Sequence, residues 1–151
     1  MDNPLIETWS INQRMVLYIL DAIAPAALSG VSLSKGRSVG AVFAHIHAVR
    51  VMWLEVALPK LKLHKVAKED VTSKAKLQSA LKASGEAMTE LFTQAATTGK
   101  VKGFKRSPTT FMGYLIAHEG YHLGEIGMTL KQAGHPLDEK AAYGMWEWGK
   151  L

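Results

Sequence analysis

The sequence predicts an all-α protein, a four-helix bundle that forms one domain over residues 1–151 and ends in a short aromatic segment. Four long stretches have helical apolar periodicity or helix-capping residues at their ends, whereas no stretch alternates like a half-buried strand. Hydrophobic residues make up 48% of the chain, which is enough for one sizeable core. Amphipathic helices of about 20 residues commonly bury their apolar faces against one another in such a bundle.

The first helix is expected from Pro4 to about Ala24. Asn3 is a favoured N-cap residue, and proline suits the first helical position because the N–H it lacks would be unpaired there. Pro25 should end the helix, since it has no N–H with which to continue it. The loop that follows, LSGVSLSKG, is short enough for the first two helices to be antiparallel neighbours.

The second helix is expected from about Ser38 to Leu58, directly before a proline, and the third from about Thr72 to Ala96. Between them lies a longer basic linker, so loop length alone does not fix the topology. The third helix has a one-sided apolar seam with alternating spacings of four and three residues. Its members are Leu77, Leu81, Ser84, Met88, Leu91 and Ala95.

The fourth helix has the clearest ends. Ser107 and Pro108 should open it as N-cap and first residue, and Gly134, followed by Pro136, should close it. The short segment after it carries three aromatic residues, Tyr143, Trp146 and Trp148. These side chains either form a wall of the functional pocket or pack across one end of the bundle.

Composition excludes several classes of protein. The absence of cysteine excludes disulfides and thiolate metal sites. The N-terminal sequence has no basic-then-apolar signal pattern, so we expect a cytoplasmic protein. We do not expect a membrane span, because the most apolar stretch, 39–58, is interrupted by four polar residues. These are His45, His47, Arg50 and Glu55.

Positive charge is concentrated in residues 60–106, which contain 11 Lys and Arg against 4 Asp and Glu. Such a strip is either a solvated helix face with its linker or a surface for an acidic ligand. No nucleic-acid recognition motif and no glycine-rich phosphate loop accompanies it. We therefore favour the solvated face and do not expect nucleic acid as a partner.

The strongest functional signal is the string His118-Glu119-Gly120-Tyr121-His122 in the fourth helix. On a helix the two histidines lie one turn apart, about 40° from each other on one face. That face should point into the bundle, because its other members are mostly apolar: Phe111, Leu115, Ile126 and Thr129. Two such imidazoles can ligate one metal ion in a bundle core. The alternative is a pair of hydrogen-bonded core histidines.

The second helix offers two candidates for a third ligand, His45 and His47. They are about 200° apart around the helix and cannot share a face. His45 lies on the uncharged stripe, whereas His47 shares its side with Arg50. We therefore choose His45 as the ligand and expect His47 to be an outer or supporting residue. His64 and His135 are expected to be exposed to solvent.

Two motifs resemble those of the DinB/YfiT family: SVGAVFAHIHAVRVMWLE in the second helix and HEGYHLGEI in the fourth. The resemblance covers nearly the whole chain in its order of helices. It implies a four-helix bundle, often a homodimer, in which His45, His118 and His122 hold one divalent metal ion. It also implies a hydrolase, or a transferase that uses a low-molecular-weight thiol, acting on a small molecule.

Three neutral imidazoles with an open coordination position are typical of catalytic rather than structural sites. The metal would polarise a bound water or a substrate thiol and lower its pKa. Zinc and nickel both suit imidazole and are the expected ions, with iron and manganese as alternatives.

Two carboxylates are candidate catalytic residues. Glu119 follows a ligand directly, and its alternative role is a surface or interhelix ion pair. Glu125 lies about 20° from His118 around the helix, on the ligand face. Many members of the family have glutamine at the position of Glu125. The carboxylate could orient a ligand, accept a proton or bind the metal as a fourth ligand.

Two other functions compete with a metal-dependent enzyme of this kind. The H-E-x-x-H pattern is also a metallopeptidase signature. A metzincin, however, would need glycine at position 125 and histidine at 128, where this chain has Glu125 and Met128. Downstream acidic ligands such as Glu139 or Glu147 would lie beyond the end of the helix. The second alternative is a non-catalytic bundle that binds a metal or a small ligand.

Overall fold

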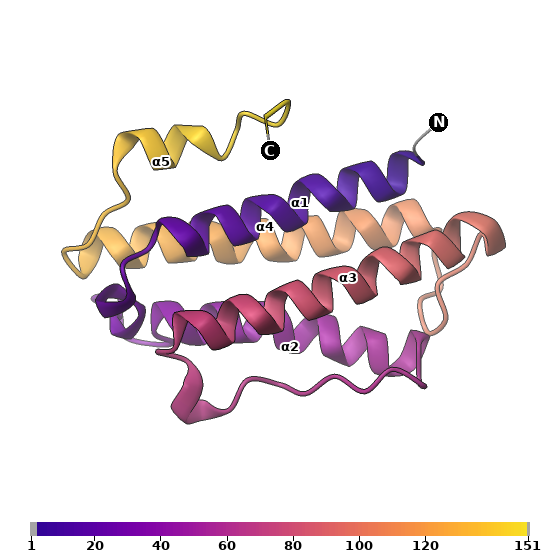
Figure 1. Cartoon of the computed structure of the whole chain (residues 1–151), viewed down its shortest axis with the longest axis horizontal. Coiled ribbons are helices and arrows are strands. Elements are labelled where there is room, and N and C mark those ends of the chain that lie inside the picture. The colour runs from indigo at the N-terminus through magenta and orange to yellow at the C-terminus, as the bar shows by residue number, and fades with distance from the viewer. Residues whose placement is uncertain (1–2, 151) are drawn as a thin grey trace.

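The computed structural model describes residues 3–150, and helices are the only regular elements in that part of the chain (Figure 1). Four long helices form the bundle: α1 (Pro4–Ala22), α2 (Val39–Ala57), α3 (Lys74–Thr98) and α4 (Pro108–Gln132). The short elements are η1 (Pro25–Ser29), η2 (Lys68–Asp70) and α5 (Glu139–Gly144). The predicted all-α bundle is confirmed, and α5 is a fifth, short helix within the C-terminal aromatic segment.

The ends of the helices follow from the capping residues. Ser38, Ser73 and Ser107 each accept a hydrogen bond from the backbone N–H three residues further on, at the starts of α2, α3 and α4. The third helix begins and ends later than predicted. Ser73 rather than an earlier residue caps it, and Gly99 ends it in the left-handed conformation, with φ 69°.

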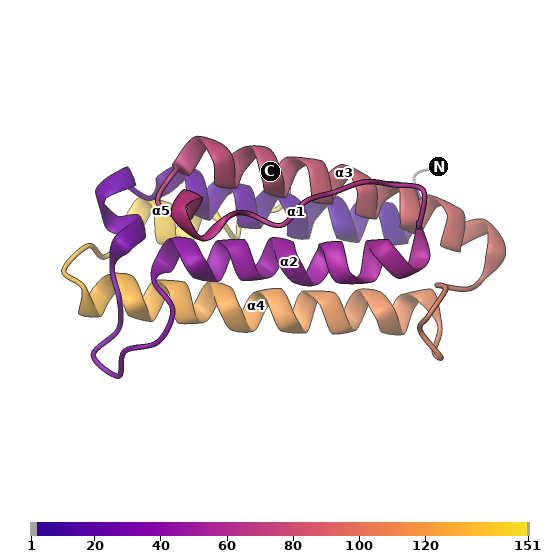
Figure 2. The ribbon, with the colours of Figure 1, turned by 90° about the horizontal axis from the view of Figure 1, so that it is seen from below.

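The four long helices pack in a ring in which α1 and α2 each lie between α3 and α4. The short first connection would have allowed α1 and α2 to be neighbours, but they occupy one diagonal of the bundle. Between them, η1 and the loop to α2 carry the chain across the end of the bundle (Figure 1). The basic linker 58–73 runs back along the bundle, so α2 and α3 point in the same direction (Figures 1 and 2).

The interior consists of two apolar clusters separated by a polar layer. One cluster is centred on Leu20, Phe43 and Leu81, and the other on Trp9 and Phe111. In each long helix the polar positions fall between the positions that belong to the two clusters. The polar layer contains the buried residues Asn12, His47, Arg50, Ser84, Glu119 and His122. A charged pair therefore crosses the middle of an otherwise apolar core.

Within the described part of the chain, α2 is the one helix long and apolar enough to cross a membrane by length and composition. Half of this apolar stretch of α2 is buried inside the bundle. Its buried face includes His47 and Arg50, whose polar atoms are paired with other helices. These contacts are those of a core helix in a bundle.

Candidate metal centre

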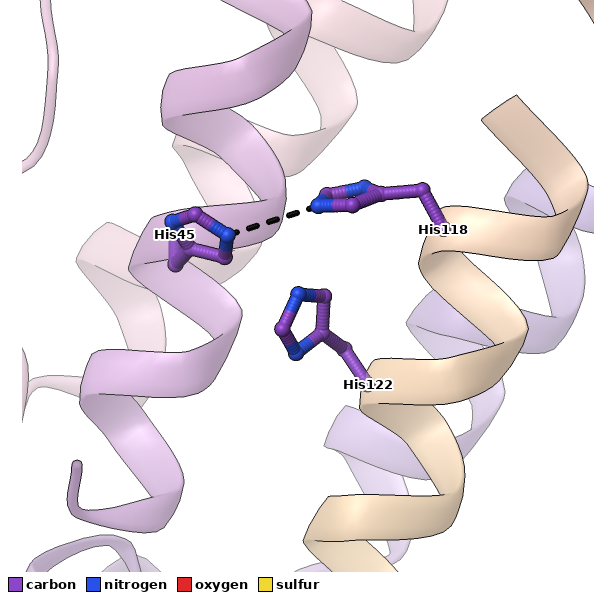
Figure 3. Close-up of side chains that lie close together, drawn as sticks. All are labelled: His45, His118 and His122. Atoms are coloured by element: carbon purple, nitrogen blue, oxygen red, sulfur yellow. Dashed lines mark hydrogen bonds between the residues drawn. The ribbon is translucent and has the colours of Figure 1, made fainter. Parts of the chain in front are cut away.

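The three histidines that were predicted to be ligands lie together between α2 and α4. One ring nitrogen from each of His45, His118 and His122 lies within 4.8 Å of the others (Figure 3). The Nε2 atoms of His45 and His118 are 3.3 Å apart. The His122 ring is edge-on to both of its neighbours, with centroids 4.7 Å from His45 and 4.6 Å from His118.

The local fold explains this convergence. His118 and His122 project from successive turns of α4, as the spacing of four residues requires. Neighbouring α2 packs against α4 and supplies His45 at the same level. The cluster lies near the surface of the bundle rather than at its centre, because His45 and His118 are half-buried and only His122 is buried.

The arrangement fits a divalent metal ion. Zinc binds imidazole nitrogen at about 2.0–2.1 Å, so two ligands of a tetrahedral site are separated by about 3.4 Å. The 3.3 Å between His45 Nε2 and His118 Nε2 matches that separation. The Nδ1 atoms of His118 and His122 are buried without a hydrogen-bond partner. The nitrogen of His118 that faces His45 is Nε2, so the fit to a metal ion rests on this separation and not on the unpaired Nδ1 atoms.

The surroundings of the cluster keep two of its histidines uncharged near neutral pH. Burial lowers the pKa of His45 to about 4, assisted by the positive charge of Arg37 and by the other two histidines, whereas Glu125 acts in the opposite direction. Burial also lowers the pKa of His118, and repulsion from His122 adds to the effect. Near neutral pH both imidazoles therefore keep the lone pairs that a metal requires.

Glu125 lies beside the cluster, as its position on the helix predicted. Its Oε1 atom is 3.6 Å from Nδ1 of His122, and its side chain is partly exposed. If His122 offers Nε2 to a metal, its Nδ1 carries the proton and can donate to this carboxylate after a small side-chain rotation. Glu125 is therefore placed to orient the His122 ring.

Glu119 has a different environment from the one expected of a catalytic base. It is completely buried, and its two carboxylate oxygens accept hydrogen bonds from Arg50 Nε at 2.6 Å and Arg50 Nη2 at 2.8 Å. Asn12 Nδ2 donates a third, also at 2.6 Å. Both oxygens are thus engaged within the core. This geometry corresponds to the alternative of an interhelix ion pair and does not support a catalytic role for Glu119.

His47 is not an outer residue, as the sequence suggested, but a core residue on the side of α2 that faces α3. Its Nε2 is 2.8 Å from the His64 carbonyl oxygen and its Nδ1 is 3.0 Å from Ser84 Oγ. The carbonyl can only accept, so Nε2 carries the proton and Nδ1 accepts from the serine hydroxyl. His47 and Arg50 are both buried, so the side of α2 that contains them faces the interior of the bundle.

The aromatic residues near the cluster are not those of the C-terminal segment. Trp146 lines a separate cavity of about 360 Å³ between α1, α4 and the C-terminal segment, and Tyr143 is 69% exposed. Tyr114 instead stacks on the ring of His118, with the planes 18° apart. Tyr114 lies four residues before His118, a spacing from which the contact could have been predicted.

The buried His47 predicts how stability depends on pH. Burial lowers the pKa of His47 in the folded protein, whereas an unfolded histidine titrates near 6.5. Below that pH the unfolded chain binds more protons, so acidification favours unfolding. The contribution of neutral His47 is complete above about pH 6.5 and is lost as the pH falls towards the folded pKa, by about 1.4 kcal/mol per unit of pKa lowering.

Urea unfolding of the metal-free protein at about pH 7.5 and about pH 5 measures this loss. The variant His47→Gln keeps an N–H donor for the His64 carbonyl but cannot titrate. We expect the free energy of unfolding to fall less between the two pH values in the variant than in the wild type. An equal fall in both proteins would show that His47 is not responsible.

Comparison with known proteins gives one match. The sequence model of the DinB family matches residues 1–147, which include all four long helices and the three clustered histidines. No curated protein and no solved structure matches the chain. The match confirms the resemblance that the histidine motifs indicated.

Proposed function

The chain belongs to the DinB family, and from that premise we propose that it is a metal-dependent enzyme in which His45, His118 and His122 hold one divalent ion. The observation that carries the proposal is the convergence of the three ring nitrogens. Zinc and nickel suit imidazole ligands best, and iron and manganese are the other candidates.

The reaction that this site supports best is a hydrolysis, or a transfer to a low-molecular-weight thiol, on a small molecule. A divalent ion held by His45, His118 and His122 would supply Lewis acidity to a water or thiol. Glu125 is a partly exposed carboxylate that lies 3.6 Å from Nδ1 of His122. We propose that it orients His122 and can exchange a proton with a substrate that enters beside it.

The metallopeptidase alternative loses support from the geometry of Glu119. A peptidase of the H-E-x-x-H type needs this glutamate as general base beside the metal. Here the carboxylate is buried and held by Arg50 and Asn12. In the described residues no strand is present to bind an extended peptide substrate.

Element analysis tests the proposed site. Protein stripped with a chelator, then equilibrated with zinc or nickel and freed of excess metal, is expected to retain one ion per chain. Chelation should abolish hydrolysis of activated esters and transfer of cysteine or glutathione to electrophilic small molecules, and added metal should restore the activity. Failure to retain any ion would overturn the proposal. Retention without either activity would favour the non-catalytic metal-binding bundle.

A further inference from the structure

A polar cavity of about 400 Å³ lies next to the histidine cluster. One side is the loop between η1 and α2, which contributes Lys35, Gly36 and Arg37, and the other is the C-terminal half of α4. Figure 2 shows this loop reaching the same end of α4. Glu125 lines the cavity and its Oε1 lies 3.6 Å from Nδ1 of His122, so this side chain connects the cavity to the proposed metal site.

The loop is held in a defined conformation. The backbone N–H of Leu33 donates to Gln132 Oε1 on α4 at 2.7 Å. Ser32 Oγ donates to the Lys35 carbonyl oxygen at 2.8 Å and closes the turn. Lys35 itself has a left-handed backbone, with φ 65°, and Gly36 follows with φ 104°. A left-handed lysine costs free energy, and such strain is concentrated at binding sites.

The cavity carries an excess of positive charge. Neither the ammonium of Lys35 nor the guanidinium of Arg37 has a hydrogen-bond or ion-pair partner in the part of the chain that the structure describes. The lining contains one carboxylate, Glu125, which lies against His122 instead. The charge of Arg37 also contributes to lowering the pKa of His45, so it acts within electrostatic range of the cluster.

We propose that this cavity binds an oxyanion group of the substrate, a carboxylate or a phosphate, and that Arg37 is its principal contact. The planar guanidinium presents paired N–H donors that match either oxyanion. Lys35 adds a second cation, and Thr129 on α4 offers a hydroxyl group. The inference rests on the proposed metal site, because it places the reactive atom of the same substrate at the three histidines.

Binding of small thiols to the cobalt(II)-loaded protein tests the inference, since a thiolate ligand gives cobalt a charge-transfer absorption. Mercaptoacetate, 3-mercaptopropionate and 4-mercaptobutyrate carry a carboxylate at three distances from the sulfur. 2-Mercaptoethyl phosphate carries the alternative anion, and 2-mercaptoethanol is the neutral reference. The ratio of each anionic affinity to the neutral one is measured in wild type and in Arg37→Gln.

We expect wild type to prefer at least one anionic thiol to 2-mercaptoethanol, and Arg37→Gln to lower that affinity ratio about tenfold. Whether the carboxylates or the phosphate show the effect identifies the oxyanion. Arg106→Gln is the matched control, because Arg106 is an exposed arginine before the other end of α4, and it should keep the wild-type preference.

Two results would overturn the inference while the proposed function stands. One is a cobalt spectrum that responds equally to neutral and anionic thiols in the wild type. The other is an anion preference that Arg37→Gln leaves unchanged. If the protein takes up no cobalt, the proposed metal site itself fails, and the inference fails with it.

Discussion

Glu119→Gln is expected to lower the free energy of unfolding by about 3–5 kcal/mol, the cost of leaving one partner of a buried ion pair without its counter-charge. Arg50 and Glu119 are both fully buried, and two hydrogen bonds join the guanidinium to the carboxylate. Glutamine has nearly the same shape but no charge. The variant therefore leaves the Arg50 guanidinium in the core with only neutral partners.

The loss of stability should affect the whole bundle, because the hydrogen bonds of Arg50 and Glu119 reach all four long helices. From α2, Arg50 Nη1 donates to Gln13 Oε1 on α1 at 2.6 Å and to the Leu81 carbonyl on α3 at 3.3 Å. Its guanidinium also lies 4.8 Å above the ring of Trp9. Domains of this size are commonly stable by about 5–15 kcal/mol, so the loss should remove a large share of the stability.

Urea unfolding of Glu119→Gln, of Arg50→Met and of the double variant Arg50→Met/Glu119→Met measures the expected effect. The double variant removes both charges and fills the space with apolar side chains. It should therefore be more stable than Glu119→Gln. A cost below about 1 kcal/mol for Glu119→Gln would contradict the prediction, because it would mean that water or a neighbouring group compensates the charge of Arg50.

The ion pair also bears on the metal centre. Arg50 follows His45 on α2 by five residues, and Glu119 directly follows His118 on α4. The two helices that supply the ligands are thus joined at nearly the level of the cluster. We expect the pair to fix the register of α2 against α4, a role that buried polar groups have in some other helical assemblies.

Local signals predicted the four long helices to within a few residues of their ends, but not the short helix α5. Asn3, Ser38 and Ser107 cap α1, α2 and α4 where the sequence placed them, because capping depends on a few adjacent residues. The arrangement of the helices could not be predicted in the same way. The length of the first connection allows both adjacent and diagonal packing, and the choice depends on contacts of α3 and α4 with both earlier helices.

The histidine cluster could be predicted because two ligands share one helix face, and the resemblance to a known family pointed to the third. His45 was preferred to His47 because of their positions around the helix, and His45 does lie in the cluster, but the premise was wrong. It assumed that the side of α2 with Arg50 faces outward, whereas that side is the most buried. The partner of Arg50 lies 69 residues away in the sequence, and no local pattern connects the two residues.

Each of the three proposed ligands is expected to be required for metal binding. Replacing His45, His118 or His122 by alanine removes one of three donors, and the affinity for zinc should fall further than the 10–100-fold that loss of an outer hydrogen-bond partner commonly costs. Glu125→Gln removes such an outer partner and should give that smaller loss. Competition with a chelator at neutral pH ranks the four variants.

His64→Ala and His135→Ala are the matched controls, because both side chains are exposed and lie outside the cluster. They should bind zinc as the wild type does. If zinc instead binds to any exposed histidine, all five histidine variants should lose zinc affinity to a similar extent.

Stability provides the second readout. The cluster buries unpaired nitrogen atoms on His118 and His122, so it contributes little to the metal-free fold. Metal-free His122→Ala should therefore unfold within about 1 kcal/mol of the metal-free wild type, while zinc raises the stability of the wild type alone.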